Sequence, residues 1–190
     1  MPDAEPGTPT HRPGGGFPIK PLLTVVILLL VAVVLNRSAP RRTPHTPQPL
    51  PPLWVEGWLN AGAAPPGAES LRGKVVAVDV WALFCPPCRA AMPELVELNR
   101  RFGGREDFVL IGLTTDPHER PEDDLDALRR YVAGVDGMDW PIGYGARLTK
   151  EALGVRFIPT LLLFDRDGMS VWRGSSVPAL AKAIEAELGS

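Results

Sequence analysis

Hydrophobic and polar positions divide the chain into an apolar segment near its start and an alternating strand and helix pattern after it. Residues 74–81, Lys-Val-Val-Ala-Val-Asp-Val-Trp, form an almost continuous apolar run, which is typical of a central strand covered on both faces. Residues 88–102 predict a helix, residues 108–113 a second buried strand, and residues 122–132 a helix with one polar face.

The end of the chain predicts a hairpin followed by a helix. Apolar strands at 161–164 and 170–172 flank Asp-Arg-Asp-Gly at 165–168, which is a turn signature. Residues 178–188 then form an amphipathic helix. Strand, helix and strand followed by hairpin and helix predict an α/β fold, a three-layer sandwich with a mixed central sheet.

The N-terminal region predicts a tail and a membrane anchor. Residues 1–20 are rich in Pro, Gly and Thr without apolar periodicity, so we expect a disordered tail. Residues 21–35, PLLTVVILLLVAVVL, carry no charge, and the stretch reaches 17 residues from Ile19 if Lys20 extends toward the lipid headgroups. That length is at the short end of the roughly 17–25 residues that a spanning helix needs. We therefore expect a single transmembrane helix at 21–35.

A cleaved secretory signal is the alternative reading of this segment. Such a signal has an apolar region of about 7–15 residues and then a small-x-small site. Here Arg37 stands where a small residue is expected and Pro40 follows the would-be cut, so we favour an uncleaved anchor. Basic residues on the two sides of the segment nearly balance, and charge alone does not decide its orientation.

After the anchor, composition predicts a spacer and one folded domain. Residues 36–52 are rich in proline and should form an extended, semi-rigid linker. Residues 53–190 form the folded domain, with 15 basic against 20 acidic residues. The chain of 190 residues is long enough for one compact domain plus an appendage. Charges of both signs are interspersed, and the basic field that nucleic-acid binding requires is missing.

The chain has only two cysteines, Cys85 and Cys88. A four-ligand zinc site would lack its second cysteine pair, and the folded domain has a single histidine, His118. Haem attachment needs histidine after the second cysteine, where this chain has Arg89. The pair therefore does not fit a four-ligand zinc site or haem attachment, and its position in the fold decides what else it can do.

Position gives the two thiols different roles. Cys85 follows a buried strand at the start of a helix, where free N–H groups and the helix dipole stabilise a thiolate, so we expect it to be the attacking sulfur. Cys88 lies in the first turn on the inward helix face and should be the shielded, resolving sulfur. A pair of inert buried thiols is the alternative, and the exposed helix start and the intervening Pro86 and Pro87 argue against it.

Residues 80–95, Val-Trp-Ala-Leu-Phe-Cys-Pro-Pro-Cys-Arg-Ala-Ala-Met-Pro-Glu-Leu, resemble the active-site segment of the TlpA/ResA-like branch of the thioredoxin superfamily. Residues 71–76 and 154–168 extend the resemblance to both sides. Members of this branch are thiol-disulfide oxidoreductases, commonly tethered by an N-terminal helix outside the bacterial cytoplasm. The resemblance implies a thioredoxin-like fold and a domain on the extracytoplasmic (periplasmic) side of the inner or plasma membrane. It implies no cofactor besides the Cys85–Cys88 disulfide, and no metal.

The resemblance also implies a substrate-binding surface. Pro159 corresponds to the cis-proline beside the active site, which presents the backbone of Ile158 to an extended substrate. Trp81, Pro86 and Pro87 complete the surface around the cysteines. The glycine usual two residues before the cis-proline is Phe157 here, which leaves the substrate open.

Asp79 departs from the asparagine that many members of the branch carry. It faces the same side of its strand as Ala77 and Trp81, and burial should raise its pKa toward neutral. A base with a pKa near 7 beneath the cysteines could accept the Cys88 proton when that thiol attacks a mixed disulfide. The alternative is a carboxyl held by a structural hydrogen bond.

These observations predict an enzyme that reduces disulfides in secreted proteins or apocytochrome c. The resemblance supplies these substrates, and it implies a membrane thiol electron donor that keeps the enzyme reduced. A disulfide-donating oxidase is a second reading, and a non-catalytic metallochaperone that uses the two thiolates is a third.

Overall fold

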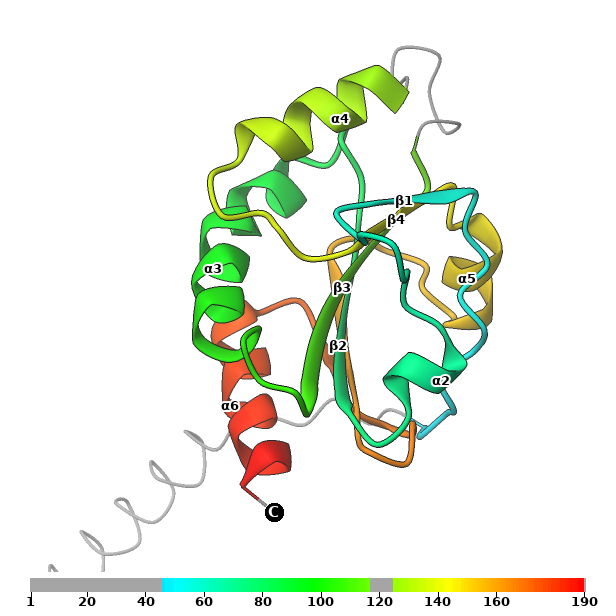
Figure 1. Cartoon of the computed structure of the whole chain (residues 1–190), viewed down its shortest axis with the longest axis vertical. Helices are drawn as coiled ribbons and strands as arrows, with labels where there is room; N and C mark the ends of the chain where they lie inside the picture. The colour runs from blue at the N-terminus through cyan, green and yellow to red at the C-terminus, as the bar shows by residue number, and fades with distance from the viewer. Residues whose placement is uncertain (1–45, 117–124, 190) are drawn as a thin grey trace, which may run out of the picture. The chain divides into compact units, whose positions relative to one another are not determined.

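The computed structural model describes residues 46–116 and 125–189 (Figure 1). The predicted tail at 1–20 and the predicted anchor at 21–35 lie outside the described residues. Within the described ranges, no helix has both the length and the apolar character that crossing a membrane requires.

A six-stranded mixed sheet forms the centre of the domain, in the order β1-β4-β3-β2-β5-β6. The central strand β2 (Val75–Trp81) runs parallel to β3 (Phe108–Thr114) and antiparallel to β5 (Thr160–Phe164). Beyond β3 lie β4 (Ile142–Tyr144) and β1 (Gly57–Leu59), and beyond β5 lies β6 (Ser170–Gly174). The predicted mixed sheet is confirmed.

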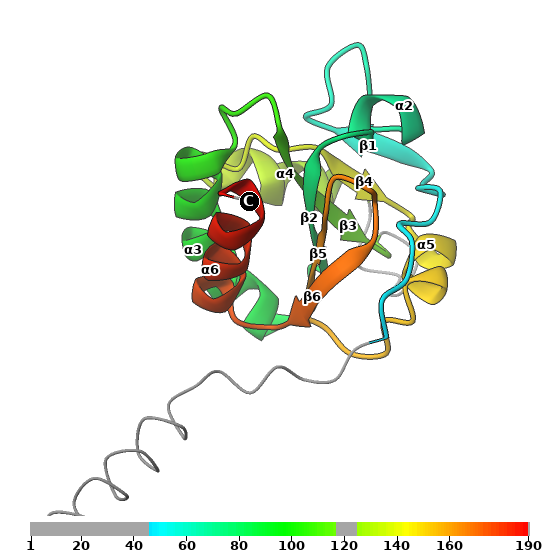
Figure 2. The ribbon, with the colours of Figure 1, turned by 90° about the horizontal axis from the view of Figure 1, so that it is seen from below.

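Helices cover both faces of the sheet, which makes the fold the predicted three-layer sandwich (Figure 2). One face carries α3 (Pro86–Phe102), α4 (Leu125–Gly134) and α6 (Val177–Leu188). The shorter helices α2 (Ala68–Leu71) and α5 (Arg147–Ala152) lie on the opposite face.

The side chains of β2 alternate between two apolar clusters, one on each face of the sheet. Ala77 and Trp81 join the cluster under α3 and α6, while Val76, Val78 and Val80 join the cluster on the other face. Side chains of a strand point alternately to opposite faces, so a strand buried on both faces reads as a continuous apolar run. This burial explains the pattern of residues 74–81.

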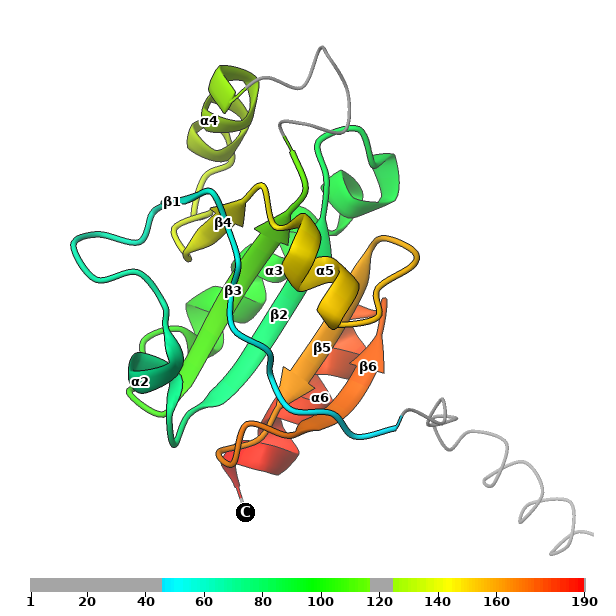
Figure 3. The same ribbon diagram turned by 90° about the vertical axis from the view of Figure 1, so that its right-hand side faces the viewer.

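Residues before β1 pack along the sheet face that carries α5 (Figure 3). Leu50 donates its N–H to Gly168 O at 2.8 Å, and Ser170 donates its N–H to Gln48 O at 2.9 Å. Leu50 also packs against the second apolar cluster. Residues 48–50, assigned to the linker from their proline-rich composition, therefore attach to the turn between β5 and β6.

Candidate active site

Cys85 caps the N-terminus of α3, directly after the turn that follows β2. Pro86 and Pro87 occupy the first helical positions, where a missing N–H removes no intrahelical hydrogen bond and the fixed φ of proline suits the helix. The proline pair therefore starts the helix directly after Cys85.

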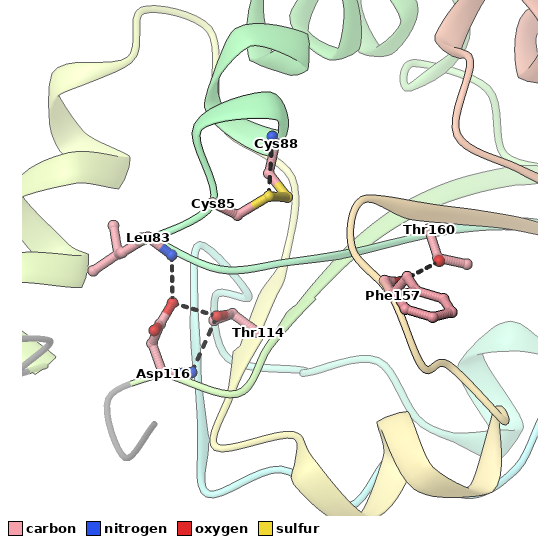
Figure 4. Close-up of a disulfide and its surroundings, with 7 residues drawn as sticks. All are labelled: Leu83, Cys85, Cys88, Thr114, Asp116, Phe157 and Thr160. Atoms are coloured by element: carbon pink, nitrogen blue, oxygen red, sulfur yellow. Dashed lines mark hydrogen bonds between the residues drawn. A yellow bond between two sulfur atoms is a disulfide. The ribbon is translucent and has the colours of Figure 1, made fainter. Parts of the chain in front are cut away.

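Cys85 and Cys88 form a disulfide with an S–S distance of 2.04 Å and a Cα–Cα distance of 5.3 Å (Figure 4). The backbone N–H of Cys88 donates to Cys85 Sγ at 3.2 Å. The same donor and the positive end of the helix dipole can stabilise a thiolate at this sulfur after reduction. The site can therefore hold a reactive thiolate at Cys85.

Both cysteines belong to the apolar cluster under α3, but they differ in exposure. Cys85 is 6% exposed and Cys88 is 1% exposed. Cys85 is thus less open than expected of an exposed helix start, because the half-buried side chains of Leu83, Phe84 and Ile158 pack against the same cluster. The order of exposure agrees with an attacking Cys85 and a shielded Cys88, and these roles stay predictions.

Asp79 lies in the middle of β2 and is 2% exposed. Its neighbours across the sheet are Gly112 on β3 and Leu161 on β5, and neither has a side chain that can donate a hydrogen bond. Within the described ranges, Oδ2 of Asp79 has no hydrogen-bond partner. Burial raises the pKa of Asp79 from 3.8 to about 7.

Two buried indole rings lie close to Gly112, across the ladder from Asp79. A Cβ atom at Gly112 would lie 3.3 Å from Nε1 of Trp81 and 3.3 Å from Nε1 of Trp140. Neither indole nitrogen has a hydrogen-bond partner in the described part of the chain. The sequence predicts the Trp81 indole on the substrate-binding surface. Because Trp81 is only 1% exposed, its indole lies beneath that surface.

Tyr131 of α4 lies over this region from the helical side. Its ring centroid is 5.6 Å from that of Trp81. Partial burial raises the pKa of the Tyr131 hydroxyl, Arg89 opposes the rise, and Asp79 adds to it. The Tyr131 hydroxyl therefore lies near enough to Arg89 and Asp79 for both charges to affect its pKa.

Asp116 is a second buried carboxyl near the motif, and sequence reasoning missed it. Its Oδ2 accepts hydrogen bonds from the Leu83 N–H at 2.7 Å and the Thr114 hydroxyl at 2.6 Å (Figure 4). Asp116 is 0% exposed and follows the end of β3. It therefore ties the turn that leads to Cys85 to the neighbouring strand. The sequence feature that could have identified Asp116 is an acidic residue soon after a buried strand, at the edge of the sheet where parallel strands end.

The Ile158–Pro159 peptide bond is cis. The β2–β5 ladder ends at Val80 and Thr160, so both residues lie beyond it, on the side where β2 leads to Cys85. Ile158 and Pro159 are half-buried, and Pro86 and Pro87 are exposed. Four of the predicted substrate-binding residues are thus at least partly open to solvent.

Neither of two surface clefts involves the cysteines. One, lined by Trp58, Asn60 and Arg129 among others, has a volume of about 450 Å³. The other, lined by Trp54, Thr115 and Leu148 among others, has a volume of about 320 Å³. In the part of the chain that is described, no group of three or more His, Cys, Asp or Glu side chains could hold a metal ion.

Sequence comparison connects this geometry to known proteins. A family model described as thioredoxin-like matches residues 73–170. Bovine nucleoredoxin (Bos taurus) is 27% identical over 140 residues, which cover 72% of this chain and 31% of that protein. Protein DipZ of Mycobacterium tuberculosis is 49% identical over 43 residues, which cover 22% of this chain and 6% of that protein. The chain thus spans less than a third of the length of these curated relatives.

Solved structures share the fold. A thioredoxin-like superfamily protein superposes with a TM-score of 0.64 at 25% identity, covering 75% of this chain and 97% of that one. A thiol-disulfide isomerase from Corynebacterium glutamicum gives a TM-score of 0.63 at 23% identity, with coverage of 75% and 97%. A secreted disulfide oxidoreductase from Mycobacterium tuberculosis gives 0.53 at 21% identity, with coverage of 65% and 89%. The chain belongs to the thioredoxin-like family, and within that fold its Cys85–Cys88 pair forms a disulfide at the N-terminus of α3.

Proposed function

We propose that this protein is a membrane-anchored thiol-disulfide oxidoreductase, with Cys85 and Cys88 as its redox centre, and that it reduces disulfides in extracytoplasmic proteins or apocytochrome c. The observation that carries the proposal is the buried Asp79 carboxyl, with a pKa of about 7, in the strand that leads to the Cys85–Cys88 pair. A thiol:disulfide interchange protein DsbE from Chlorobium tepidum is among the proteins of the same fold.

The reaction begins with both cysteines reduced. The Cys85 thiolate attacks one sulfur of the substrate disulfide, a Cys85–substrate disulfide forms, and the other substrate sulfur leaves as a thiolate. Cys88 then gives its proton to the Asp79 carboxylate and attacks the Cys85 sulfur. The Cys85–Cys88 disulfide forms, the second substrate thiolate leaves, and two electrons have passed to the substrate.

Asp79 suits the second step because of its environment. A carboxyl with a pKa near 7 is partly ionised at neutral pH, so it can take a proton and release it again. Within the described residues, Oδ2 of Asp79 has no hydrogen-bond partner that would compete with the transferred proton. This feature favours a proton acceptor over a carboxyl held by a structural hydrogen bond.

The surroundings of Cys85 support the reducing direction. A protein that stabilises its reduced thiolate strongly is a strong oxidant. Pro86 and Pro87 add no charge or side-chain donor beside that sulfur, and the ionised fraction of Asp79 opposes a further negative charge. Arg89 acts in the other direction, but its exposed charge is screened by water. The proposal therefore expects a reduction potential nearer about −270 mV than about −120 mV.

The deciding experiment is the equilibrium of the full chain, in a non-ionic detergent, with glutathione buffers. A potential near the reducing end supports the proposal, and a potential above about −180 mV refutes it in favour of a disulfide-donating oxidase. Cys88→Ser should accumulate mixed disulfides with substrate through Cys85. Cys85→Ser, its matched control, should accumulate none.

Residues 21–35 would anchor the chain and residues 53–190 would face the extracytoplasmic side, where a membrane thiol donor would return the Cys85–Cys88 disulfide to its reduced form. Protease added to cells with a permeabilised outer layer should then digest the domain. Protection until lysis would reverse the proposed topology.

A further inference from the structure

Phe157 is the most exposed large apolar side chain of the described residues, at 83%. It lies in the loop between α5 and β5, two residues before Pro159. The Thr160 hydroxyl donates to the Phe157 carbonyl at 2.6 Å, which holds this turn against the start of β5 (Figure 4). The fold therefore fixes the backbone of Phe157 but leaves its side chain largely exposed among the described residues.

The position of Phe157 relates it to the disulfide. The β2–β5 ladder ends at Val80 and Thr160. Past this end, β2 continues toward Cys85, while the chain before β5 contains the cis bond and Phe157. Both loops leave the sheet at the same edge. A polypeptide that brings a disulfide to Cys85 would therefore pass along the loop that carries Phe157.

Each of the two loops has an arginine next to it in the chain. Arg156 directly precedes Phe157, and Arg89 directly follows Cys88. Both side chains are exposed, and neither forms an ion pair with another described residue. Residues 53–190 carry 15 basic and 20 acidic residues, so an arginine beside Phe157 and another beside Cys88 stand out against an acidic domain.

We propose that Phe157, Arg156 and Arg89 form a specificity surface for an extended protein segment with an apolar residue and carboxylates beside its disulfide. The apolar residue would cover the Phe157 ring, and the carboxylates would face the two arginines, which have no acidic partner in the described part of the chain. The inference rests on the proposed reduction of protein disulfides and names the chemical class of its substrates.

The test uses the pre-reduced full chain in detergent and follows single turnovers on four disulfides. Three are synthetic peptides of equal length, each closed by one disulfide, with Phe-Asp, Phe-Lys or Ser-Asp beside a cysteine. The fourth is hydroxyethyl disulfide, which has no side chains to recognise. Rates on the peptides are expressed relative to the rate on hydroxyethyl disulfide, so that changes in thiol reactivity cancel.

Wild type should favour the Phe-Asp peptide over the Ser-Asp peptide by about tenfold, because burying a phenylalanine side chain is worth at least that factor. Phe157→Ala should abolish this preference. Arg156→Glu should change the ratio of Phe-Asp to Phe-Lys rates by about threefold or more in favour of lysine. The charge effect should weaken as salt is added.

Val171→Ala and Arg72→Glu are matched controls. Val171 is 36% exposed on β6, and Arg72 is exposed just before β2, at the opposite end of that strand from Cys85. Both controls should keep every wild-type ratio.

The outcomes separate the inference from the proposed function. If wild type fails to reduce hydroxyethyl disulfide and all three peptides, the proposed function falls. If hydroxyethyl disulfide is reduced but the peptides react at one rate, or if Phe157→Ala and Arg156→Glu keep wild-type ratios, only the specificity surface is refuted. Unchanged peptide ratios together with a Phe157-dependent binding to phosphatidylglycerol vesicles, or a Phe157-dependent dimer, would also refute it.

Discussion

Replacement of Asp79 by asparagine should change how the stability of the oxidised protein depends on pH. Burial raises the pKa of Asp79 from 3.8 to about 7 in the folded state. Between these two values the unfolded chain has lost a proton that the folded chain keeps. The free energy of unfolding therefore falls as pH rises through this window.

The magnitude follows from the two pKa values. Each pH unit between them removes about 1.4 kcal/mol from the free energy of unfolding. The window from 3.8 to about 7 spans roughly three units, so wild type should lose about 4 kcal/mol relative to Asp79→Asn. The contribution is complete below pH 3.8, and the loss levels off above about pH 7.

Urea unfolding of the full chain from pH 4 to about pH 8.5 would measure this effect. The buried Trp81 and Trp140 provide a fluorescence signal for unfolding. Subtracting the wild-type curve from the Asp79→Asn curve removes the groups that titrate equally in both. The exposed Asp167 offers a matched control, and Asp167→Asn should run parallel to wild type at every pH.

Parallel curves for wild type and Asp79→Asn would refute the reasoning. They would mean that the folded protein ionises Asp79 as readily as the unfolded chain does. The carboxyl would then be fully ionised at neutral pH, and its proposed exchange of a proton with Cys88 would lose its physical basis.

Two further substitutions test the packing and hydrogen bonds beneath the site. Asp116→Ala should lower the free energy of unfolding by about 1–3 kcal/mol, because the Leu83 N–H would lose its 2.7 Å acceptor, and urea unfolding of the oxidised protein would measure the loss. Gly112→Ala should cost about 1–3 kcal/mol in the same assay, because its Cβ would lie 2.6 Å from Ile142 Cδ1. Gly104→Ala, where nothing lies within 4 Å of the added atom, should stay close to wild type.

The longer elements of the fold were predictable because buried positions give their sequences a clear pattern of apolar residues. The predicted strand at 74–81 is β2 (Val75–Trp81), and the predicted helix at 88–102 lies within α3 (Pro86–Phe102). The short strands β1 and β4 were missed. Each has three residues, which is too few to show an alternation, and each is defined by long-range pairing, β1 with β4 and β4 with both β1 and β3.

The candidate site divides in a similar way. The cysteine motif could be recognised because its residues are close together in the sequence. The alternation of side chains along β2 was enough to place Asp79 in the interior. Asp116 was missed because its role depends on Leu83, which is 33 positions away in the chain. The exposure of Phe157 was also beyond the sequence, since an apolar residue in a loop gives no sign of whether a partner covers it.

The state of Asp79 depends on strand register, which local sequence does not specify. Pairing places Gly112 on one side of the carboxyl and Leu161 on the other, so neither adjacent strand can donate a side-chain hydrogen bond. Position 112 itself has no side chain, and an added Cβ atom would lie 2.6 Å from Ile142 Cδ1, so that side chain would have to shift to admit one. As the chain stands, Gly112 offers the Asp79 carboxyl no side-chain donor. Within the described residues Oδ2 of Asp79 has no hydrogen-bond partner, and desolvation by burial is the physical origin of a pKa near 7 in the strand that leads to Cys85.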